Sequence, residues 1–340
     1  MKPWGRLPGD DPERDRAERE AAIEAAGIDL HPVSPAEHAH PHERSGAGEP
    51  PVIGIVGAGA VGTALGVALS RAGWPVHAVS SRDAARRERF RSLVTVTRTF
   101  VDPEALVEEV ELIVLAVPDD VIAPLAGGLR MYSGQAMVHT SGAVGAEVLA
   151  PAMAAGTQIG SFHPLVAFAD TERAVAALHG ATVAIEGDDQ LAALLARMAE
   201  AMGAVPVRLA PGSKPAYHAA AVLAAGGFVA LLDAIAELGR AAGLDEAGSL
   251  TIYGPLIEGT LANARALGIR AALTGPITRG DVGTVRAHLA ALRDLAPDAL
   301  DLYVAAGHRE ITLAEGRGAL APAAATAMRG LLAGALARRD

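Results

Sequence analysis

A glycine-rich segment between an apolar run and an amphipathic stretch constrains this chain more than any other feature. Val52–Val56 is a continuous apolar run, Gly57–Gly62 reads Gly-Ala-Gly-Ala-Val-Gly, and Val61–Ala72 has the apolar spacing of a helix. A G-x-G-x-x-G segment between a strand and a helix is typical of a dinucleotide-binding βαβ unit. The sequence therefore predicts a Rossmann-type domain that begins near Pro51.

Each glycine of this loop has its own mechanical role. The first makes the tight turn, the second lets the backbone approach a diphosphate, and the third lets helix and strand pack closely. The diphosphate is then held at the helix N-terminus, where free N–H groups and the helix dipole favour negative charge. We expect cofactor contacts from the whole loop, which consists of Gly57, Ala58, Gly59, Ala60, Val61 and Gly62.

Strand and helix patterns alternate through the rest of the first two thirds of the chain. Short apolar runs predict strands at Pro75–Val79, Glu111–Val117, Gln135–His139, Gln158–Phe162, Thr182–Ile185 and Val205–Leu209. Helical spacing lies between them at Pro103–Glu109, Val121–Leu129, Ala146–Ala154 and Asp188–Met202. This alternation predicts an α/β fold with a doubly wound, mostly parallel sheet.

After Pro211 the strand signals stop. The remaining segments all have helical patterns, at Lys214–Ala242, Glu246–Leu267, Val282–Leu295, Ala299–Glu315 and Pro322–Arg338. We therefore expect three parts: an extension over residues 1–50, a Rossmann domain over 51–210, and an all-helical domain over 211–340.

Residues 1–50 differ in composition from the rest. They are rich in charges and prolines, show helical spacing only near Glu18–Ala26, and contain His31, His38, His40 and His42. This composition predicts a disordered or loosely attached extension. A metal-binding histidine tract is the alternative, but the histidines lack a regular ligand spacing, and we expect no metal.

Composition excludes several classes of protein. The chain has no cysteine and a net charge of −10, so we expect no disulfide framework and no nucleic-acid partner. Ala216–Leu232 is the most membrane-like run, but Lys214 and Asp233 bracket it, and we interpret it as a core helix rather than a membrane span. The charged N-terminus lacks the apolar region of a signal peptide, which favours the cytoplasm.

The end of the second predicted strand selects between the two nicotinamide cofactors. An NAD site usually has Asp or Glu there to bind the ribose 2′-hydroxyl. This chain instead has Ser80, Ser81 and Arg82, and an arginine can grip a 2′-phosphate with paired charge-assisted hydrogen bonds. The segment therefore favours NADP, although Arg82 at a solvated helix start is the plainer interpretation.

Five further segments carry a family resemblance. They are Ala116–Asp120, His139–Gly142, Gly160–Leu165, Tyr217–Ala220 and Leu273–Asp281. Together they resemble a family that joins a Rossmann-like NADP-binding domain to a helical C-terminal domain of unknown function, and the resemblance runs from about Val52 to Leu313. In layout this family is similar to pyrroline-carboxylate reductases, 6-phosphogluconate and 3-hydroxyisobutyrate dehydrogenases, and ketopantoate reductases.

The resemblance implies a reductase that passes hydride from NADPH to a small carbonyl or imine substrate. Some members of the family are an alternative class of ketopantoate reductase, so a 2-oxo acid such as ketopantoate is the leading substrate. A helical domain that forms a homodimer and completes the active site is also implied. Residues Val117, Pro118, Thr140 and Ser141 lie in the matching segments, and we expect them to contact the cofactor.

Candidate catalytic residues follow the predicted strands and open the first C-terminal helix. Ser161–His163 lies just past a predicted strand, at the edge where a Rossmann ligand binds. Lys214, Tyr217 and His218 are spaced i, i+3 and i+4, which places them on one helix face. The resemblance makes Lys214 the counterpart of a catalytic lysine. His163, Tyr217 and His218 are the other candidates, each of which can instead be a structural core residue.

Two features complicate this assignment. Arg279 and Asp281 have a structural interpretation, because Asp281 is well placed to cap the helix that begins near Val282. The resemblance also leads us to expect an asparagine one turn or more after the lysine or the Tyr-His pair, where this chain has Ala225-Gly226-Gly227. Either the substrate differs, Asn263 substitutes, or activity is weak.

Three alternatives therefore stay open beside a 2-oxo acid reductase. One is an imine reductase similar to pyrroline-carboxylate reductase. Another is a non-catalytic NADP-binding sensor or interaction protein. The third concerns the cofactor, because deazaflavin-linked reductases share the glycine loop.

Overall fold

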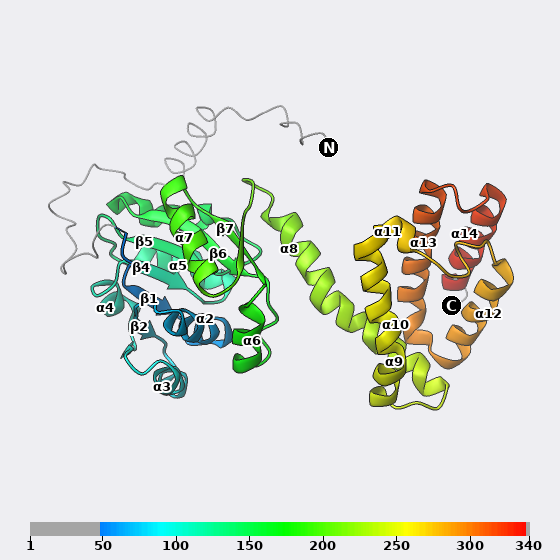
Figure 1. Ribbon diagram of the computed structural model, residues 1–340, viewed down its shortest axis with the longest axis horizontal. Coiled ribbons are helices and arrows are strands. Elements are labelled where there is room, and N and C mark those ends of the chain that lie inside the picture. Colours follow the sequence, from blue (N-terminus) through cyan, green and yellow to red (C-terminus); the bar gives the residue numbers. More distant parts are fainter. Residues whose placement is uncertain (1–47, 338–340) are drawn as a thin grey trace, which may run out of the picture. The chain divides into compact units, whose positions relative to one another are not determined.

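A computed structural model describes residues 48–337, and these form two compact units (Figure 1). The first, here called the sheet unit, ends at Ala221, and the second, the helical unit, begins at Val222. The division falls about ten residues beyond the boundary expected near Pro211, because the helix that follows Ser213 begins on the sheet unit. The histidines and the helical stretch expected before Gly48 lie outside the described residues.

The sheet unit is built on one eight-stranded sheet with the order β3-β2-β1-β4-β5-β6-β7-β8. Every neighbouring pair is parallel except β6 and β7, which are antiparallel. The strands are β1 (Ile53–Val56), β2 (Val76–Ser80), β3 (Arg98–Phe100), β4 (Leu112–Leu115), β5 (Ala136–His139), β6 (Gln158–Pro164), β7 (Thr182–Glu186) and β8 (Val205–Arg208). The doubly wound, mostly parallel sheet predicted from the sequence is confirmed.

Helices cover both faces of this sheet and make a three-layer unit (Figure 1). One apolar core contains Leu65, Phe90 and Leu195, so it lies under α2, α3 and α7. The other contains Leu106, Ile122 and Leu149, so it lies under α4, α5 and η2. The helices are α2 (Ala60–Arg71), α3 (Ala84–Leu93), α4 (Pro103–Val107), α5 (Asp119–Gly128), the 3₁₀ segment η2 (Ala146–Ala155), α6 (Thr171–Leu178) and α7 (Asp189–Ala201).

Three elements of the sheet unit were not predicted: α3, β3 and α6. Helix α3 contains five charged residues and buries only Phe90, so its sequence lacks a clear apolar stripe. Strand β3 has three residues, too few to show alternation. Both α3 and α6 do begin with side-chain caps, from Asp83 and Asp170, and these aspartates were the signal available in the sequence.

The helical unit contains no strand among its described residues. It consists of α9 (Phe228–Ala241), α10 (Glu246–Leu267), the short α11 (Ile269–Ala272), α12 (Val282–Leu295), the 3₁₀ turn η4 (Pro297–Ala299), α13 (Leu300–Gly316) and α14 (Pro322–Leu336). Its core gathers Leu289, Leu300, Ile311, Met328 and Leu332 from α12, α13 and α14. The expected helices correspond to α10, α12, α13 and α14, whose ends lie within two residues of the expected positions among the described residues. The short α11 was not predicted.

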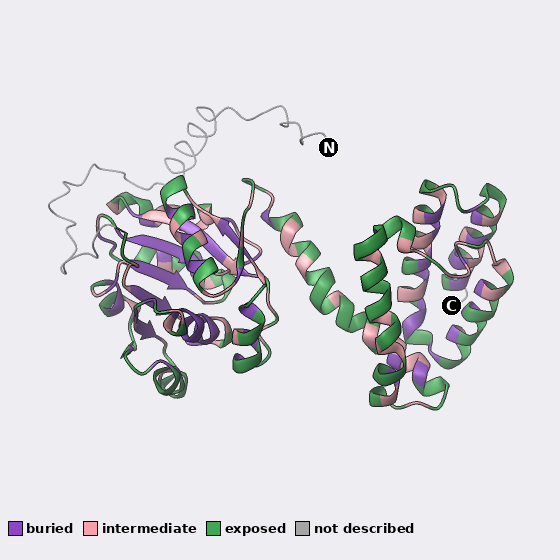
Figure 2. Ribbon diagram, in the orientation of Figure 1, coloured by how far each residue is buried: buried purple, intermediate pink, exposed green. Residues whose placement is uncertain are grey.

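A single long helix joins the two units in the sequence. It comprises α8 (Lys214–Val222), a π-helical segment η3 (Leu223–Gly227) and α9. Within the described residues it is the helix long and apolar enough to cross a membrane. Its most apolar 18-residue stretch has a mean hydropathy of 2.1, and only 6% of that stretch is buried. The prediction of a core helix was therefore wrong for the chain by itself: its apolar residues are largely exposed (Figure 2).

Candidate active site

The glycine loop lies at the carboxyl end of β1, where the strand order reverses between β1 and β4. This is the position at which open α/β sheets bind ligands. Gly57 has a φ of +108°, and its N–H donates to the Ser80 carbonyl at 2.9 Å. A Cβ at Gly57 would lie 2.2 Å from the Ala116 carbonyl oxygen, and one at Gly62 would lie 2.0 Å from that of Gly57. Only glycine therefore fits at these two positions.

The second glycine of the loop, Gly59, lies in open space. A Cβ at Gly59 would have no neighbour within 4 Å. Gly59 is the N-cap of α2, and neither a side-chain cap nor an acidic residue occupies the first turn. The free N–H groups of this turn and the helix dipole are thus available to an anion, and the open space above Gly59 has room for one.

The segment expected at the 2′-phosphate has three different environments. Ser80 lies in β2 and is 2% exposed, so it belongs to the sheet. Ser81 is half-buried and Arg82 is exposed, which leaves these two side chains accessible to a ligand. Asp83 caps α3 by accepting hydrogen bonds from Ala85 N at 2.9 Å and Arg86 N at 3.1 Å.

The loops after β4 and β5 lie beside the glycine loop on the same edge of the sheet. Val117 is half-buried and Pro118 is exposed. The Thr140 hydroxyl donates to the Leu115 carbonyl at 3.3 Å, and the Ser141 hydroxyl accepts from Ala143 N at 3.1 Å. Both hydroxyls therefore hold the shape of the loop after β5.

A row of polar side chains crosses three strands next to this loop. His139 on β5 pairs with Ser161 on β6, and Ser161 pairs with Glu186 on β7. Paired residues of neighbouring strands share a face of the sheet, as do residues two apart in one strand, so His163 lies on this face too. Strand β6 runs on to Pro164, so Ser161 and His163 lie within the strand rather than just past it.

His163 meets the first turns of α8. Its Nδ1 lies 3.3 Å from the Tyr217 hydroxyl, and its ring centroid lies 5.8 Å from that of His218. A Cβ at Gly142 would lie 2.6 Å from His163 Nε2 and 2.4 Å from His218 Nδ1. The structure thus brings three of the four predicted catalytic side chains together beside the loop after β5. We call His163, Tyr217, His218 and Gly142 the histidine–tyrosine cluster.

The protonation states within this cluster follow from burial. Burial, followed by the nearby charges of Lys214 and His218, lowers the pKa of His163 to about 4. Burial also raises the pKa of Tyr217. At neutral pH His163 is therefore an uncharged imidazole, and Tyr217 keeps its proton. His218 Nδ1 is buried without a hydrogen-bond partner, so the cluster has an unused polar atom.

Lys214, the fourth predicted catalytic residue, occupies a different environment. Its side chain is 1% exposed, and its Nζ lies 3.0 Å from Glu186 Oε2. Ser161 Oγ donates to the same carboxylate oxygen at 2.6 Å. Burial lowers the pKa of Lys214, and the charge and hydrogen bond of Glu186 oppose that change. Glu186 was not anticipated from the sequence, because only the antiparallel pairing of β6 with β7 brings it to Ser161.

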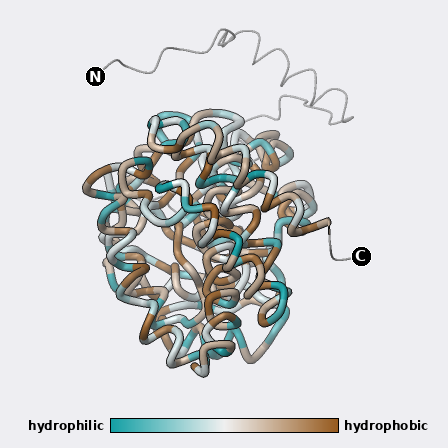
Figure 3. Tube along the Cα trace, turned by 90° about the vertical axis from the view of Figure 1, so that its right-hand side faces the viewer, coloured by the Kyte–Doolittle hydropathy of each residue, from teal (hydrophilic) through white to brown (hydrophobic). Residues whose placement is uncertain are grey.

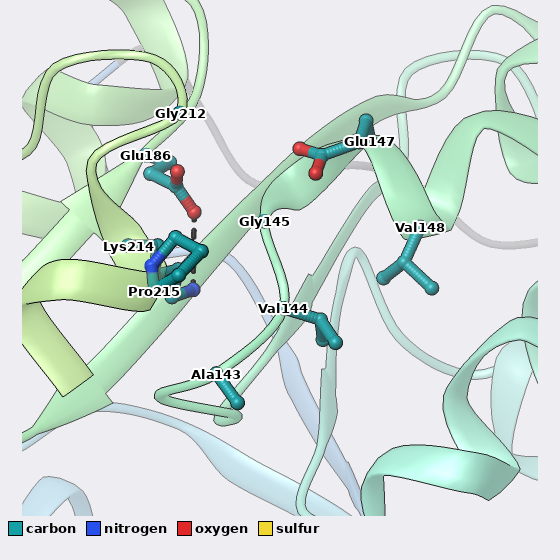
Figure 4. Close-up of a pocket in the computed structure, with 9 residues that line it drawn as sticks. All are labelled: Ala143, Val144, Gly145, Glu147, Val148, Glu186, Gly212, Lys214 and Pro215. Carbon is teal, nitrogen blue, oxygen red and sulfur yellow. Dashed lines mark hydrogen bonds and ion pairs between the residues drawn. The ribbon is translucent and has the colours of Figure 1, made fainter. Parts of the chain in front are cut away.

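A cavity of about 480 Å³ opens beside this ion pair (Figure 4). Glu186 and Lys214 form one part of its wall, joined by their hydrogen bond, and Glu147 lies on another part. The rest of the lining is small or apolar and consists of Ala143, Val144, Gly145, Val148, Gly212 and Pro215. The cavity therefore offers two carboxylates and one ammonium.

His139 was also not anticipated as a functional residue. Its imidazole is fully buried, its Nδ1 accepts from Ser141 N at 3.2 Å, and its Nε2 lies 3.1 Å from the Gly145 carbonyl. These contacts leave the proton on Nε2 in the neutral ring. Burial lowers the pKa of His139 to about 4, so a neutral imidazole braces the loop that borders the cavity.

The remaining residues singled out in the sequence lie in the helical unit or at its start. Asp281 caps α12 by accepting from Thr284 N at 3.0 Å, as predicted, while Arg279 and Asn263 are exposed. Gly226 lies in the π-helical segment, and a Cβ there would meet nothing within 4 Å. Within the described chain no second helix closely approaches Gly226.

No group of three or more His, Asp or Glu side chains with the arrangement of a metal site occurs among residues 48–337. The groups available for chemistry are a phosphate-binding helix N-terminus, a neutral histidine–tyrosine pair and a buried ammonium.

Two family models match the chain. The model of a Rossmann-like domain matches residues 39–164, and that of DUF2520, a domain of unknown function, matches residues 181–310. No curated protein matches the sequence.

Solved structures share the fold at low identity. A candidate NADP oxidoreductase from Bacteroides fragilis is 24% identical with a TM-score of 0.61, and the match covers 78% of this chain and 97% of that one. An imine reductase from a Pseudomonas species is 19% identical with a TM-score of 0.62, covering 85% and 100%. The pyrroline carboxylate reductase of Plasmodium falciparum, solved with NADP bound, is 13% identical with a TM-score of 0.54, covering 83% and 98%.

These structures share the fold of this chain, a Rossmann-like sheet followed by helices. The chain combines a Rossmann-like domain with a C-terminal DUF2520 domain.

Proposed function

We propose that this protein is an NADPH-dependent reductase of small carbonyl substrates, with the 2-oxo acid ketopantoate as the first to test. The observation that carries the proposal is the histidine–tyrosine cluster. It places a protonated Tyr217 against a neutral His163 beside the loop after β5, on the sheet edge that also carries the glycine loop.

The residues present fit NADPH. The uncapped first turn of α2 and the open space above Gly59 would hold the diphosphate, and Ser81 with Arg82 would hold the 2′-phosphate. The loop containing Val117 and Pro118 and the loop after β5 would border the nicotinamide. When bound, the cofactor supplies a hydride equivalent. A deazaflavin lacks this 2′-phosphate, so the accessible Arg82 supports NADPH.

The side chains of the site would serve the substrate oxygen. Reduction of a carbonyl develops negative charge on oxygen, which needs a proton donor or a positive group. Tyr217 keeps its proton and can donate it, while His163 fixes the orientation of the hydroxyl at 3.3 Å. Lys214 supplies the positive charge at the cavity wall.

Steady-state oxidation of NADPH in the presence of ketopantoate tests this function. We expect Tyr217→Phe to lower kcat/KM by about 100-fold or more, the usual contribution of a positioned proton donor. Tyr303→Phe is a matched control, because Tyr303 pairs with His288 at 2.9 Å in the helical unit. No turnover of ketopantoate by the unmodified protein would rule out this substrate. Tight NADPH binding without turnover of any substrate would favour the sensor alternative.

An imine substrate is the second candidate, and two observations favour it. The fold resembles that of an imine reductase and a pyrroline carboxylate reductase. The cavity also places Glu147 and Glu186 against the single ammonium of Lys214, and an excess of carboxylate suits a cationic iminium. A higher kcat/KM for cyclic imines than for 2-oxo acids would decide for this candidate.

We further propose that the active protein is a homodimer formed through the helical unit. Large exposed apolar side chains concentrate between Val222 and Ile269, and extended apolar patches mark interaction surfaces. They are Val222, Leu223, Phe228, Val229, Leu231, Leu250, Ile252, Leu256, Leu261, Leu267 and Ile269. Hydrophobic stretches run along the helices that face the viewer in Figure 3.

Light scattering after size-exclusion chromatography tests the dimer. We expect twice the mass of one 34.5 kDa chain, and a monomer for Leu256→Glu, which places a charge at the most exposed large apolar side chain of α10. Leu336→Glu, at an exposed position on α14, is the control that should stay dimeric. A monomer that binds lipid vesicles would instead identify the apolar helix as a membrane contact.

A further inference from the structure

Lysine is rare in this chain, and one of its lysines is buried. The sequence has 29 Lys and Arg residues, of which only Lys2 and Lys214 are lysines. Lys214 is 1% exposed and is the largest charged side chain among the fully buried residues. A buried ammonium is costly unless it is paired and hydrogen-bonded, so the surroundings of Lys214 have to compensate that cost.

The compensating group is the carboxylate of Glu186. Its Oε2 accepts hydrogen bonds from Lys214 Nζ at 3.0 Å and from Ser161 Oγ at 2.6 Å. Ser161 and Glu186 are paired residues of β6 and β7, so the sheet itself fixes the position of the carboxylate. The Ser161 hydroxyl in turn limits the rotation of the Glu186 side chain, and Lys214 receives a rigid partner.

Other charged and titratable groups lie around Lys214 on every neighbouring element. Glu147 on η2 and Asp119 on α5 favour its charged form less strongly than Glu186 does. His139 on β5 and His163 on β6 also sense the charge, since Lys214 lowers the pKa of both. The charge state of Lys214 therefore acts on the histidine–tyrosine cluster as well as on the cavity.

We propose that Glu186 is a positioning residue that, anchored by Ser161, keeps Lys214 charged at the cavity wall, where the ammonium acts on the substrate. This rests on the proposed reductase function for the role of the ammonium, but the hold of Glu186 on Lys214 is a property of the chain alone. The chain uses arginine almost everywhere else. A lysine suits this position because the pKa of a buried ammonium responds to a neighbouring carboxylate, whereas a guanidinium stays charged.

Carbon-13 NMR of the lysine side chain tests the proposal directly. In a Lys2→Arg background, protein grown with lysine labelled at Cε gives one signal, whose pH titration reports the pKa of Lys214. We expect Glu186→Gln to lower that pKa by about one unit or more, as loss of an adjacent opposite charge does. Glu147→Gln, which removes the other carboxylate of the cavity, is the matched control and should lower it by less.

The proposal would be overturned if the pKa of Lys214 were the same in Glu186→Gln and in Glu147→Gln. If Glu186→Gln does not fold, as judged by circular dichroism, Glu186→Asp replaces it. Its carboxylate ends one methylene short of Nζ, so the pKa must fall in the same direction by a smaller amount, and an unchanged value counts against the proposal.

The pH dependence of kcat/KM separates positioning from a structural role. If the ammonium acts on the substrate, the basic limb of the profile should move to lower pH in Glu186→Gln by the shift that NMR measures. If the basic limb of the kcat/KM profile stays at the same pH while the pKa of Lys214 measured by NMR changes, the charge of Lys214 does not contribute to the reaction. Failure of the unmodified protein to reduce any substrate contradicts the proposed function and leaves the NMR result to stand independently.

Discussion

Helices α2 and α10 both contain glycines, but the surroundings of these glycines differ. In α2, a Cβ at Gly62 would meet the Gly57 carbonyl oxygen at 2.0 Å, and one at Gly66 would meet the Phe90 ring at 2.3 Å. In α10, a Cβ at Gly254 or Gly259 would meet nothing within 4 Å. Gly62 and Gly66 of α2 therefore allow close packing inside the chain, whereas Gly254 and Gly259 of α10 do not.

Apolar side chains show the same contrast. Eight of the twelve residues of α2 are buried, whereas Ser249 alone is buried among the twenty-two of α10. Helix α2 thus buries most of its side chains within the chain, while α10 exposes nearly all of its own (Figure 2). This difference is the basis of our proposal that the helical unit packs against a second copy of the chain.

The largest expected effect concerns the buried ion pair of the sheet unit, Lys214 with Glu186. Lys214→Met leaves the Glu186 carboxylate, which is only 12% exposed, without its cation, and we expect a loss of about 3–5 kcal/mol in the free energy of unfolding. Arg208→Met is the control, because Arg208 pairs with Asp189 at the surface and should cost less than about 1 kcal/mol. Chemical denaturation of both variants measures the difference, and similar small losses would contradict it.

The next effect concerns close packing in the glycine loop. Gly62→Ala forces a methyl group against backbone that cannot move aside, and we expect a loss of about 1–3 kcal/mol in stability. Gly59→Ala has open space, so stability should hold while the affinity for NADPH falls by about tenfold, or 1.4 kcal/mol. Denaturation and fluorescence titration with NADPH test the pair. Equal stability losses in the two variants would mean that the loop is not packed as described.

A pH titration of stability tests the enclosed histidine. The pKa of His139 is lowered from 6.5 to about 4 in the folded chain. Between these values the unfolded chain binds a proton that the folded chain refuses, so stability falls as pH falls, by up to about 1.4 kcal/mol per unit for this group.

The variant that isolates this effect is His139→Gln. As the pH falls from 6.5 to 4, the free energy of unfolding of this variant should decrease less than that of the unmodified protein. His77→Gln, which changes a partly exposed histidine, should keep the original dependence. Identical pH dependences of stability in His139→Gln and the unmodified protein would show that His139 is accessible to protons.

The smallest effect tests the open surface of the connecting helix. Gly226 lies in a helix with no neighbour for a Cβ, so Gly226→Ala should raise stability by about 1 kcal/mol through helix propensity alone. Thermal unfolding at several protein concentrations measures this. A loss of stability that grows with dilution would instead show that a second chain packs against Gly226.

Local patterns in the sequence determined most of the fold. The apolar run before Gly57 and the helical spacing after Gly62 were sufficient for the βαβ unit, because strand and helix periodicities are properties of neighbouring residues. The cap at Asp281 was predictable for the same reason. Helix α3 and strand β3 were not, since a charged helix and a three-residue strand have little periodicity to detect.

The candidate site was decided by tertiary structure. The spacing of Lys214, Tyr217 and His218 placed them on one helix face, but it could not show that Tyr217 meets His163 while Lys214 meets Glu186. Both contacts depend on how the start of α8 lies against β6 and β7, which joins residues distant in sequence. The sequence by itself therefore determined the cofactor-binding sheet. Only the antiparallel pairing of β7 with β6 decided that Ser161 and Glu186 lie beside Lys214.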